Sequence, residues 1–94
     1  MEELELPKSI LQRLVKQSLP DGIMVQKDAK TALSRSAILF ISFLTATAND
    51  ISLAGKQKTI QPKHIFEALK TMGFTDFEES LQNSLESKSP IFKV

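Results

Sequence analysis

The 94-residue chain lacks several residue types that mark particular classes of protein: it has no cysteine, tryptophan or tyrosine, and only one histidine. Without cysteine there is neither a disulfide framework nor a thiolate metal site, which argues against a secreted, disulfide-stapled module and makes a reducing, intracellular compartment the expectation. The length leaves room for one domain and excludes a second.

Long apolar runs are also scarce. The longest, Ala37 to Leu44, is interrupted by Ser42 and is far shorter than the roughly 20 residues that cross a bilayer. Met1 is followed by acidic residues instead of a basic region and an apolar run, so no secretory leader is expected. The sequence therefore predicts neither a membrane span nor a membrane partner.

A strong net charge of one sign is missing as well. Twelve Lys and Arg against eleven Asp and Glu leave a formal net charge of +1. Residues 54–73 nevertheless carry four lysines and one glutamate, whereas residues 74–94 carry twice as many acidic as basic side chains. The chain can therefore present a local basic patch, but its overall field is too weak to indicate nucleic-acid binding by charge alone.

The first half of the chain predicts a short helix followed by a very long one. Pro7 suits the first position of a helix whose apolar residues recur every three or four positions until Ser18, where residues 19–22 form a breaker cluster. Residues 27–54 contain no glycine or proline, and Gly55 follows in the place of a C-cap glycine. These 28 residues predict one helix roughly 42 Å long.

Two further short helices are predicted after it. Pro62 opens a helix of about eleven residues that ends at Gly73. Thr75 and Glu78 have the spacing of a capping box at the start of a fourth helix. The fold class predicted from these elements is all-α.

The helix lengths predict an interface. Flanking helices of about eleven residues span roughly 16 Å each and cannot cover a 42 Å helix whose centre is apolar nearly all round. Exposed apolar surface of this extent marks an interface, and a chain of this size is marginal alone, so we expect obligate pairing with another chain. The predicted dimer interface comprises Leu33, Ala37, Phe40, Ile41, Leu44, Ala48, Ile51, Ile65 and Leu69.

Short, long and short helices joined by two extended loops resemble the histone fold. The local strings that carry the resemblance are Leu6-Pro7-Lys8-Ser9-Ile10, Ala48-Asn49-Asp50-Ile51 and Gly55-Lys56-Gln57-Lys58-Thr59-Ile60. The resemblance covers about residues 6–86. It implies a single histone-fold domain over 1–94, with its core over about 6–73 and an extra C-terminal helix over about 75–86.

Within that superfamily the chain resembles the B-type small subunits of DNA polymerase epsilon, a family shared with chromatin-accessibility complexes. The strings concerned are Leu19-Pro20-Asp21-Gly22, Lys27-Asp28-Ala29 and Leu44-Thr45-Ala46-Thr47-Ala48-Asn49-Asp50. The resemblance implies an obligate heterodimer with an A-type histone-fold subunit, no active site, no cofactor and a nuclear location. It further implies as partners the catalytic subunit of DNA polymerase epsilon, double-stranded DNA, and histones H3 and H4.

Two alternatives stay open beside this interpretation. A transcription-factor subunit of the nuclear factor Y type would prefer one DNA site strongly. A homodimeric DNA-packaging protein of the archaeal kind would fold and compact DNA without a partner.

Candidate DNA-binding residues gather on and beside the second loop, where lysines can neutralise phosphates and a hydroxyl can donate to them. They are Lys56, Lys58, Thr59 and Lys63, with Lys8, Arg13 and Lys27 as further candidates on the first helix and at the start of the second. The alternative is an ordinary solvated lysine face. No aromatic, Asn or Gln cluster accompanies the lysines, so any DNA binding should be largely independent of sequence.

The second loop departs from the histone pattern in one respect. Histone folds commonly pair a loop Arg with an Asp at the start of the third helix, and here those positions hold Gln57 and His64. We expect a neutral hydrogen bond between these two side chains to replace the ion pair. His64 has no second ligand residue at metal-binding spacing, so we interpret it as structural.

The remaining chemistry-bearing residues have simpler explanations. The serines lack a base partner and the glycines form no phosphate-binding motif, so no enzyme is expected. Helical positions assign five phenylalanines to core packing, namely Phe40, Phe43, Phe66, Phe74 and Phe77. Four acidic residues of the fourth helix are interpreted as its solvent face, with a histone-binding surface as the alternative: Asp76, Glu78, Glu79 and Glu86.

Overall fold

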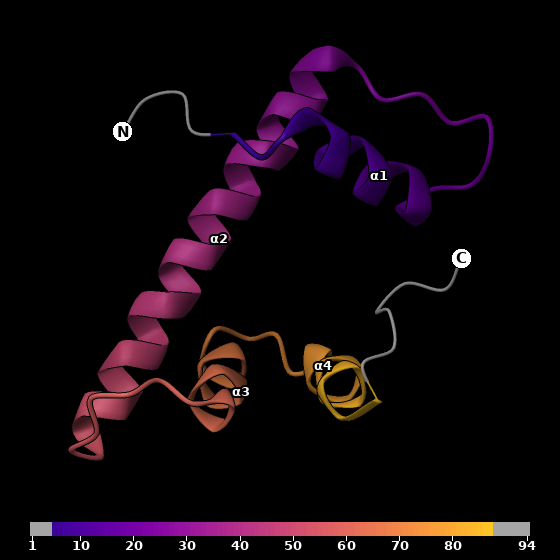
Figure 1. The fold of residues 1–94 in the computed structure, drawn as a ribbon. Helices are drawn as coiled ribbons and strands as arrows, with labels where there is room; N and C mark the ends of the chain where they lie inside the picture. The colour runs from indigo at the N-terminus through magenta and orange to yellow at the C-terminus, as the bar shows by residue number, and fades with distance from the viewer. Residues whose placement is uncertain (1–4, 88–94) are drawn as a thin grey trace. The chain divides into compact units, whose positions relative to one another are not determined.

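The structure, a computed structural model, describes residues 5–87. This part of the chain contains four helices and no strand: α1 (Lys8–Ser18), α2 (Lys27–Ala54), α3 (Pro62–Thr71) and α4 (Phe77–Ser87) (Figure 1). The all-α prediction is confirmed, and α2 has the predicted bounds. The described residues divide into two compact units, 5–40 and 41–87, and each is described by itself.

The first unit holds α1 and the first half of α2. Pro7 is the N-cap of α1 and not its first residue, so the predicted start is wrong by one position. Leu11 is the one residue of α1 that is buried. In the loop after α1, Gly22 adopts a φ of 89°, a left-handed conformation that a residue with a β-carbon rarely takes.

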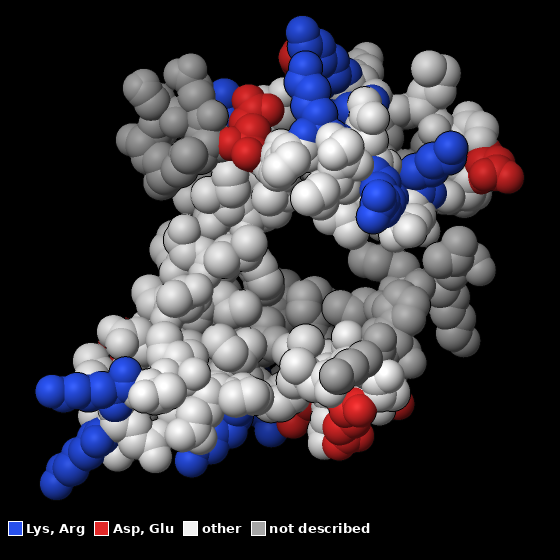
Figure 2. Space-filling model, viewed as in Figure 1, with Lys and Arg blue, Asp and Glu red and all other residues white. Residues whose placement is uncertain are grey.

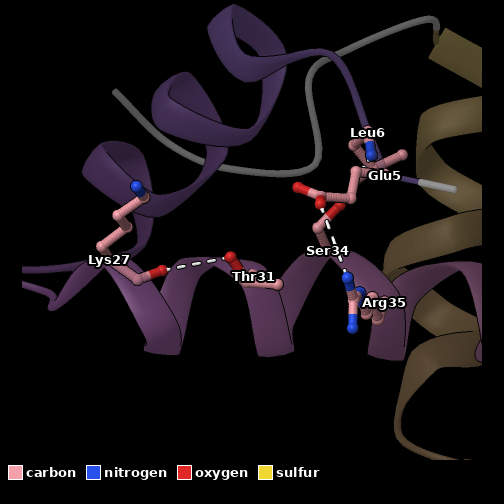
Figure 3. Close-up of polar contacts among 6 residues, drawn as sticks. All are labelled: Glu5, Leu6, Lys27, Thr31, Ser34 and Arg35. Carbon is pink, nitrogen blue, oxygen red and sulfur yellow. Dashed lines mark hydrogen bonds and ion pairs between the residues drawn. The ribbon is translucent and has the colours of Figure 1, made fainter. Parts of the chain in front are cut away.

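A buried hydroxyl ties the segment before α1 to α2 (Figure 3). Ser34 of α2 is fully buried, and its Oγ accepts a hydrogen bond of 2.6 Å from the Leu6 backbone amide. Beside it, Arg35 and Glu5 form an ion pair of 3.8 Å between half-exposed side chains, a geometry that contributes less than about 1 kcal/mol. The buried hydrogen bond is therefore the stronger determinant of this contact.

The second unit holds the rest of α2 together with α3 and α4. Its core consists of small and aliphatic residues, with Ala48 and Ala68 fully buried and Leu69 3% exposed. Two polar side chains, Ser52 and His64, are buried among them. Burial of polar groups is costly unless they are hydrogen-bonded, so these two side chains are the informative ones.

The C-terminal ends of α2 and α3 use the same backbone motif. After α3, the Gly73 amide donates to the Lys70 carbonyl at 3.0 Å and the Phe74 amide to the Leu69 carbonyl at 2.8 Å, with Gly73 at a φ of 91°. This is a Schellman motif with glycine at the left-handed position. Gly73 thus ends α3 as predicted, two residues after Thr71.

At the end of α2 the left-handed residue is not the glycine. The Lys56 amide donates to the Leu53 carbonyl at 2.8 Å and the Gln57 amide to the Ser52 carbonyl at 2.9 Å, and Lys56 has a φ of 61°. The prediction that Gly55 is the C-cap glycine is therefore wrong by one residue. The left-handed position that favours glycine in this motif is occupied by Lys56.

The predicted capping box at α4 is absent from the described residues. The helix begins at Phe77, and the Glu78 carboxylate lies 3.4 Å from the Lys70 Nζ instead of capping its own helix. Glu78 contributes only a backbone bond there, its amide donating to the Thr75 carbonyl at 3.2 Å. The capping box of this chain lies at the start of α3 and joins Gln61 to His64.

By length and hydropathy alone, α2 passes the criteria for a helix that crosses a membrane. The prediction against a span rests on the apolar run Ala37 to Leu44, whereas the length and hydropathy criteria apply to the whole 28-residue helix. Length and hydropathy do not separate a membrane span from a helix that a second protein covers.

Candidate nucleic-acid interface and partner-binding face

The second loop, residues 55–61, carries three of the four candidate DNA-binding residues of the second unit. Lys56, Lys58 and Thr59 are all exposed, and Lys63 is exposed at the second residue of α3. Basic side chains project into solvent where this loop follows α2 (Figure 2). Free lysine ammonium groups on a surface loop are suited to phosphate contacts that carry no sequence information.

The loop is held to the end of α2 by a buried hydroxyl. Ser52 is 1% exposed, and its Oγ lies 2.9 Å from the Gln57 carbonyl oxygen and 3.2 Å from the Thr59 carbonyl oxygen, so its single hydroxyl hydrogen is shared between these two acceptors. At the other end of the loop, the Gln61 backbone amide donates to the His64 Nδ1 at 2.9 Å. The two ends of the loop are therefore fixed by different side chains.

The predicted hydrogen bond between Gln57 and His64 is not formed. Within residues 5–87, the Gln57 Oε1 is buried and has no hydrogen-bond partner. His64 is the third residue of α3, so its ring lies next to the amide that precedes its own helix and completes the capping box there. The substitution of both histone positions thus did not create a new side-chain pair.

Sequence reasoning missed Ser52, the residue that holds the loop. A weak signal was present, because a serine four residues before Lys56 stands between the apolar residues Ile51 and Leu53. A serine in a helix usually bonds back to its own turn or faces solvent, so the spacing alone does not single it out.

The remaining DNA-binding candidates lie in the first unit. Lys8 is the first residue of α1 and Lys27 the first residue of α2, and both are exposed, as is Arg13. The backbone carbonyl of Lys27 accepts a hydrogen bond of 3.3 Å from Thr31, which leaves its ammonium group out of that contact (Figure 3). The structure thus groups four of the seven candidates on one loop and the start of the helix after it.

The predicted partner-binding face divides into accessible and inaccessible residues. Leu33 is 48% and Ile41 55% exposed. Ala48 and Leu69 are already buried inside the chain, so they pack within the second unit. The half-buried members of the predicted set are Ala37, Phe40, Leu44, Ile51 and Ile65.

Three large exposed apolar side chains of α2 were not in the predicted set: Leu39, Phe43 and Leu53, the last 52% exposed. Leu39 is 52% and Phe43 63% exposed, and residues four apart are neighbours on one face of a helix. The assignment of Phe43 to the core of this chain is therefore wrong. Phe74 and Phe77 are also exposed, at 37% and 49%, although their rings contact one another with centroids 5.3 Å apart.

Other site chemistry is sparse. No group of three His, Asp or Glu side chains that could hold a metal ion occurs within residues 5–87. On α4 the half-buried Glu78 is paired with Lys70, and the other acidic candidates are exposed: Asp76, Glu79 and Glu86. The surface features that stand out are the lysine-bearing loop and the apolar faces of α2.

Residues 4–69 match the family described as histone-like transcription factor (CBF/NF-Y) and archaeal histone. This chain belongs to that family. The match spans α1, α2 and nearly all of α3, so the predicted histone fold is confirmed. α4 follows the matched region and packs against α3.

Several curated relatives are DNA polymerase epsilon subunits by name. The histone-fold chain is 36% identical over 86 residues to DNA polymerase epsilon subunit 3 of Rattus norvegicus, covering 92% of itself and 59% of the rat protein. It is 33% identical over 93 residues to the subunit of the same name from Drosophila melanogaster, covering 99% of itself and 73% of that protein.

A transcriptional relative is similar over a shorter region. One subunit of the NCT transcriptional regulatory complex of Aspergillus fumigatus is 36% identical over 78 residues, which cover 81% of the histone-fold chain and 55% of the relative. The histone-fold chain therefore spans little more than half the length of the rat and Aspergillus relatives.

Proposed function

We propose that this histone-fold chain is a non-catalytic nuclear subunit that pairs with an A-type histone-fold partner, and that the pair binds double-stranded DNA as an accessory module of DNA polymerase epsilon. The observation that carries the proposal is the apolar surface of α2 that the described part of the chain leaves uncovered. The similarity to the polymerase epsilon subunits of rat and fly supports the choice of complex.

The uncovered side chains supply a driving force for pairing. Leu33, Ile41 and Phe43 are each about half exposed. Fully burying an aliphatic or aromatic side chain contributes about 1.5–3 kcal/mol, so covering the exposed half of each contributes on the order of 1 kcal/mol. With the half-buried residues of α2 added, a partner that covers this helix gains enough to make pairing obligatory for so small a chain.

The second loop supplies the DNA-binding part of the proposal. Its exposed Lys56, Lys58 and Thr59 can contact phosphates. Lys63 extends the same surface, and Lys8, Arg13 and Lys27 of the first unit are the further candidates. The surface holds no cluster of base-reading side chains within residues 5–87, so the bound DNA would be held through its backbone without sequence preference.

Chromatin partners are a further part of the proposed role. Asp76, Glu79 and Glu86 expose carboxylates on or beside α4 that suit basic histones H3 and H4. Reversing Glu79 and Glu86 to lysine should weaken histone binding and leave the heterodimer intact. Equal histone binding by both versions would assign these residues to an ordinary solvent face.

A transcription-factor role is the second candidate, and the similarity to the NCT subunit favours it. Such a subunit would show a strong preference for one DNA site. The archaeal-type alternative, a self-sufficient homodimer, remains a prediction to be separated from pairing by mass measurement.

The first experiment measures solution mass and helical content of the chain alone and after co-expression with an A-type histone-fold partner. We expect an aggregated or unfolded chain alone and a helical one-to-one complex with the partner. A well-folded homodimer would favour the packaging alternative. A stable monomer would contradict the argument from the exposed α2 face.

The second experiment measures binding of that complex to short duplexes of unrelated sequence over a range of salt concentrations. Each phosphate contact contributes about 0.9 to the slope of log affinity against log salt, so Lys56→Ala/Lys58→Ala should reduce the slope by about 2. Lys56→Arg/Lys58→Arg keeps the charge and should retain the slope. A preference for one duplex of about tenfold or more would favour the transcription-factor role.

A further inference from the structure

We infer that Ser52 is the positioning residue of the second loop: its buried hydroxyl holds the loop backbone in the conformation that presents Lys56 and Lys58 to DNA. The part of this inference that concerns DNA rests on the proposed function. The part that concerns the loop conformation rests on the contacts of Ser52 alone.

Two donors join Ser52 to the loop. Its backbone carbonyl accepts from the Gln57 amide at 2.9 Å, and its hydroxyl shares one hydrogen between the carbonyls of Gln57 at 2.9 Å and Thr59 at 3.2 Å. Gln57 is thus bonded to Ser52 through both its amide and its carbonyl. The loop turns back on the last turn of α2 around this one side chain.

Burial makes these bonds consequential. Ser52 is 1% exposed, so water does not compete for its hydroxyl. Both contacts of the hydroxyl are partly buried, and removing it would take away the one donor that the two carbonyl groups share. A partly buried acceptor that loses its partner is unfavourable until water reaches it, so the loop would move to hydrate these carbonyls.

The backbone between the anchored residues needs such support. Lys56 lies in the left-handed region, which is unfavourable for a residue with a β-carbon. Its own amide donates to the Leu53 carbonyl, and the amide of the next residue, Gln57, donates to the Ser52 carbonyl. The Gln57 side chain gives no alternative anchor, since its Oε1 is buried without a hydrogen-bond partner within residues 5–87.

The anchor acts on the residues that carry charge. Lys56 directly precedes the doubly bonded Gln57, and Lys58 lies between the two carbonyls that Ser52 binds. A fixed loop presents the two ammonium groups in one arrangement, so less conformational freedom is lost when they meet phosphates. Without the anchor the charges remain, and only their arrangement is lost.

The test is Ser52→Ala in the complex with the A-type partner, with Ser34→Ala as a matched control. Ser34 is also a fully buried serine of α2, but its Oγ bonds Leu6 in the first unit. The two variants therefore remove the same group from the same helix, and only one of them removes it from the loop.

The first readout is hydrogen exchange of the Lys56 and Gln57 amides, which bond to α2 carbonyls. In Ser52→Ala we expect their exchange to accelerate about tenfold or more, while the Gly73 and Phe74 amides of the α3 motif keep their rates. Ser34→Ala should leave all four amides unchanged. Unchanged exchange at Lys56 and Gln57 in Ser52→Ala would overturn the inference.

The second readout is affinity for a short duplex of mixed sequence. Ser52→Ala should weaken binding several-fold with little change in the salt slope, because no charge is removed. Wild-type affinity in a variant with accelerated loop exchange would refute the link to DNA and retain the anchor. If the wild-type complex itself does not bind the duplex, the proposed function fails, while the exchange readout still decides the anchor.

A second variant covers loss of assembly. If Ser52→Ala does not form the heterodimer, Ser52→Cys keeps a side chain of nearly the same shape with a much weaker donor, and the same two readouts apply. Loop exchange in Ser52→Cys equal to that of the wild type would overturn the inference.

Discussion

Replacing Lys56 with glycine should stabilise the protein, although it removes a proposed DNA contact. Lys56 holds a φ of 61° at the position of the Schellman motif where glycine is favoured. The matched variant is Lys56→Ala, which removes the same charge and keeps the β-carbon. Comparing the glycine and alanine variants therefore isolates the cost of the backbone conformation from the loss of the lysine side chain.

The magnitude follows from two opposing effects. The left-handed conformation costs a residue with a β-carbon about 1–2 kcal/mol. Glycine loses about 0.4–1 kcal/mol more than alanine when the unfolded chain is ordered. The difference predicts that Lys56→Gly is more stable than Lys56→Ala by about 0.5–1 kcal/mol.

The second Schellman motif of the chain provides the opposite substitution. Gly73 has a φ of 91°, and a β-carbon added there would meet nothing within 4 Å. Gly73→Ala should therefore be destabilised by about the same 0.5–1 kcal/mol, because only the backbone conformation is penalised. Gly55 precedes Lys56 outside the left-handed region, and its added β-carbon would lie 3.6 Å from the Ser52 carbonyl oxygen, an ordinary contact.

The assay is denaturant unfolding of the complex with its A-type partner, performed for all variants at one protein concentration. Equal m-values are required, so that midpoints report stability alone. If Lys56→Gly proved less stable than Lys56→Ala, the argument from the left-handed backbone would be wrong. DNA affinity is a second, independent measurement. Lys56→Gly and Lys56→Ala should weaken DNA binding equally, because both remove the same charge, while they differ in stability.

Substitutions at two further positions test the packing of the second unit by the same unfolding measurement. Leu69→Ala should lower the free energy of unfolding by about 2–5 kcal/mol because this side chain is 3% exposed, whereas Leu69→Met should cost less than about 1.5 kcal/mol. Glu78→Gln removes the ion pair between Glu78 and Lys70, whose side chains are 40% and 52% exposed respectively. This variant should lower the free energy of unfolding by less than about 1 kcal/mol. A loss above about 2 kcal/mol in Glu78→Gln would assign that carboxylate a role beyond the ion pair.

The candidate site was predictable where it depends on charge and missed where it depends on packing. The lysines of the second loop stand out in the sequence because four basic residues lie in a segment with one acidic residue. Ser52 does not stand out, because its role requires the Gln57 and Thr59 carbonyls to return to the end of α2. The expected Gln57 bond failed for a related reason, since the His64 ring bonds the amide that precedes its own helix.

The sequence by itself determined the helices and predicted the need for a partner. Stretches without glycine or proline and apolar spacing act over a few residues, so the bounds of α2 could be predicted from residues 27–54 alone. Helix lengths then showed that α1 and α3 are too short to cover α2. Both conclusions depend on helix bounds and helix lengths, and a sequence pattern is sufficient to predict these.

Only the tertiary structure decided which groups are buried and what they bind. It placed Ala48 and Leu69 inside the chain, left Phe43 exposed, and put the left-handed residue at Lys56 instead of Gly55. These outcomes depend on contacts between segments that meet only after the chain turns back. A buried hydroxyl such as Ser52 acquires its function from those contacts, because hydrogen bonds act over about 3 Å and the sequence does not specify which groups come that close.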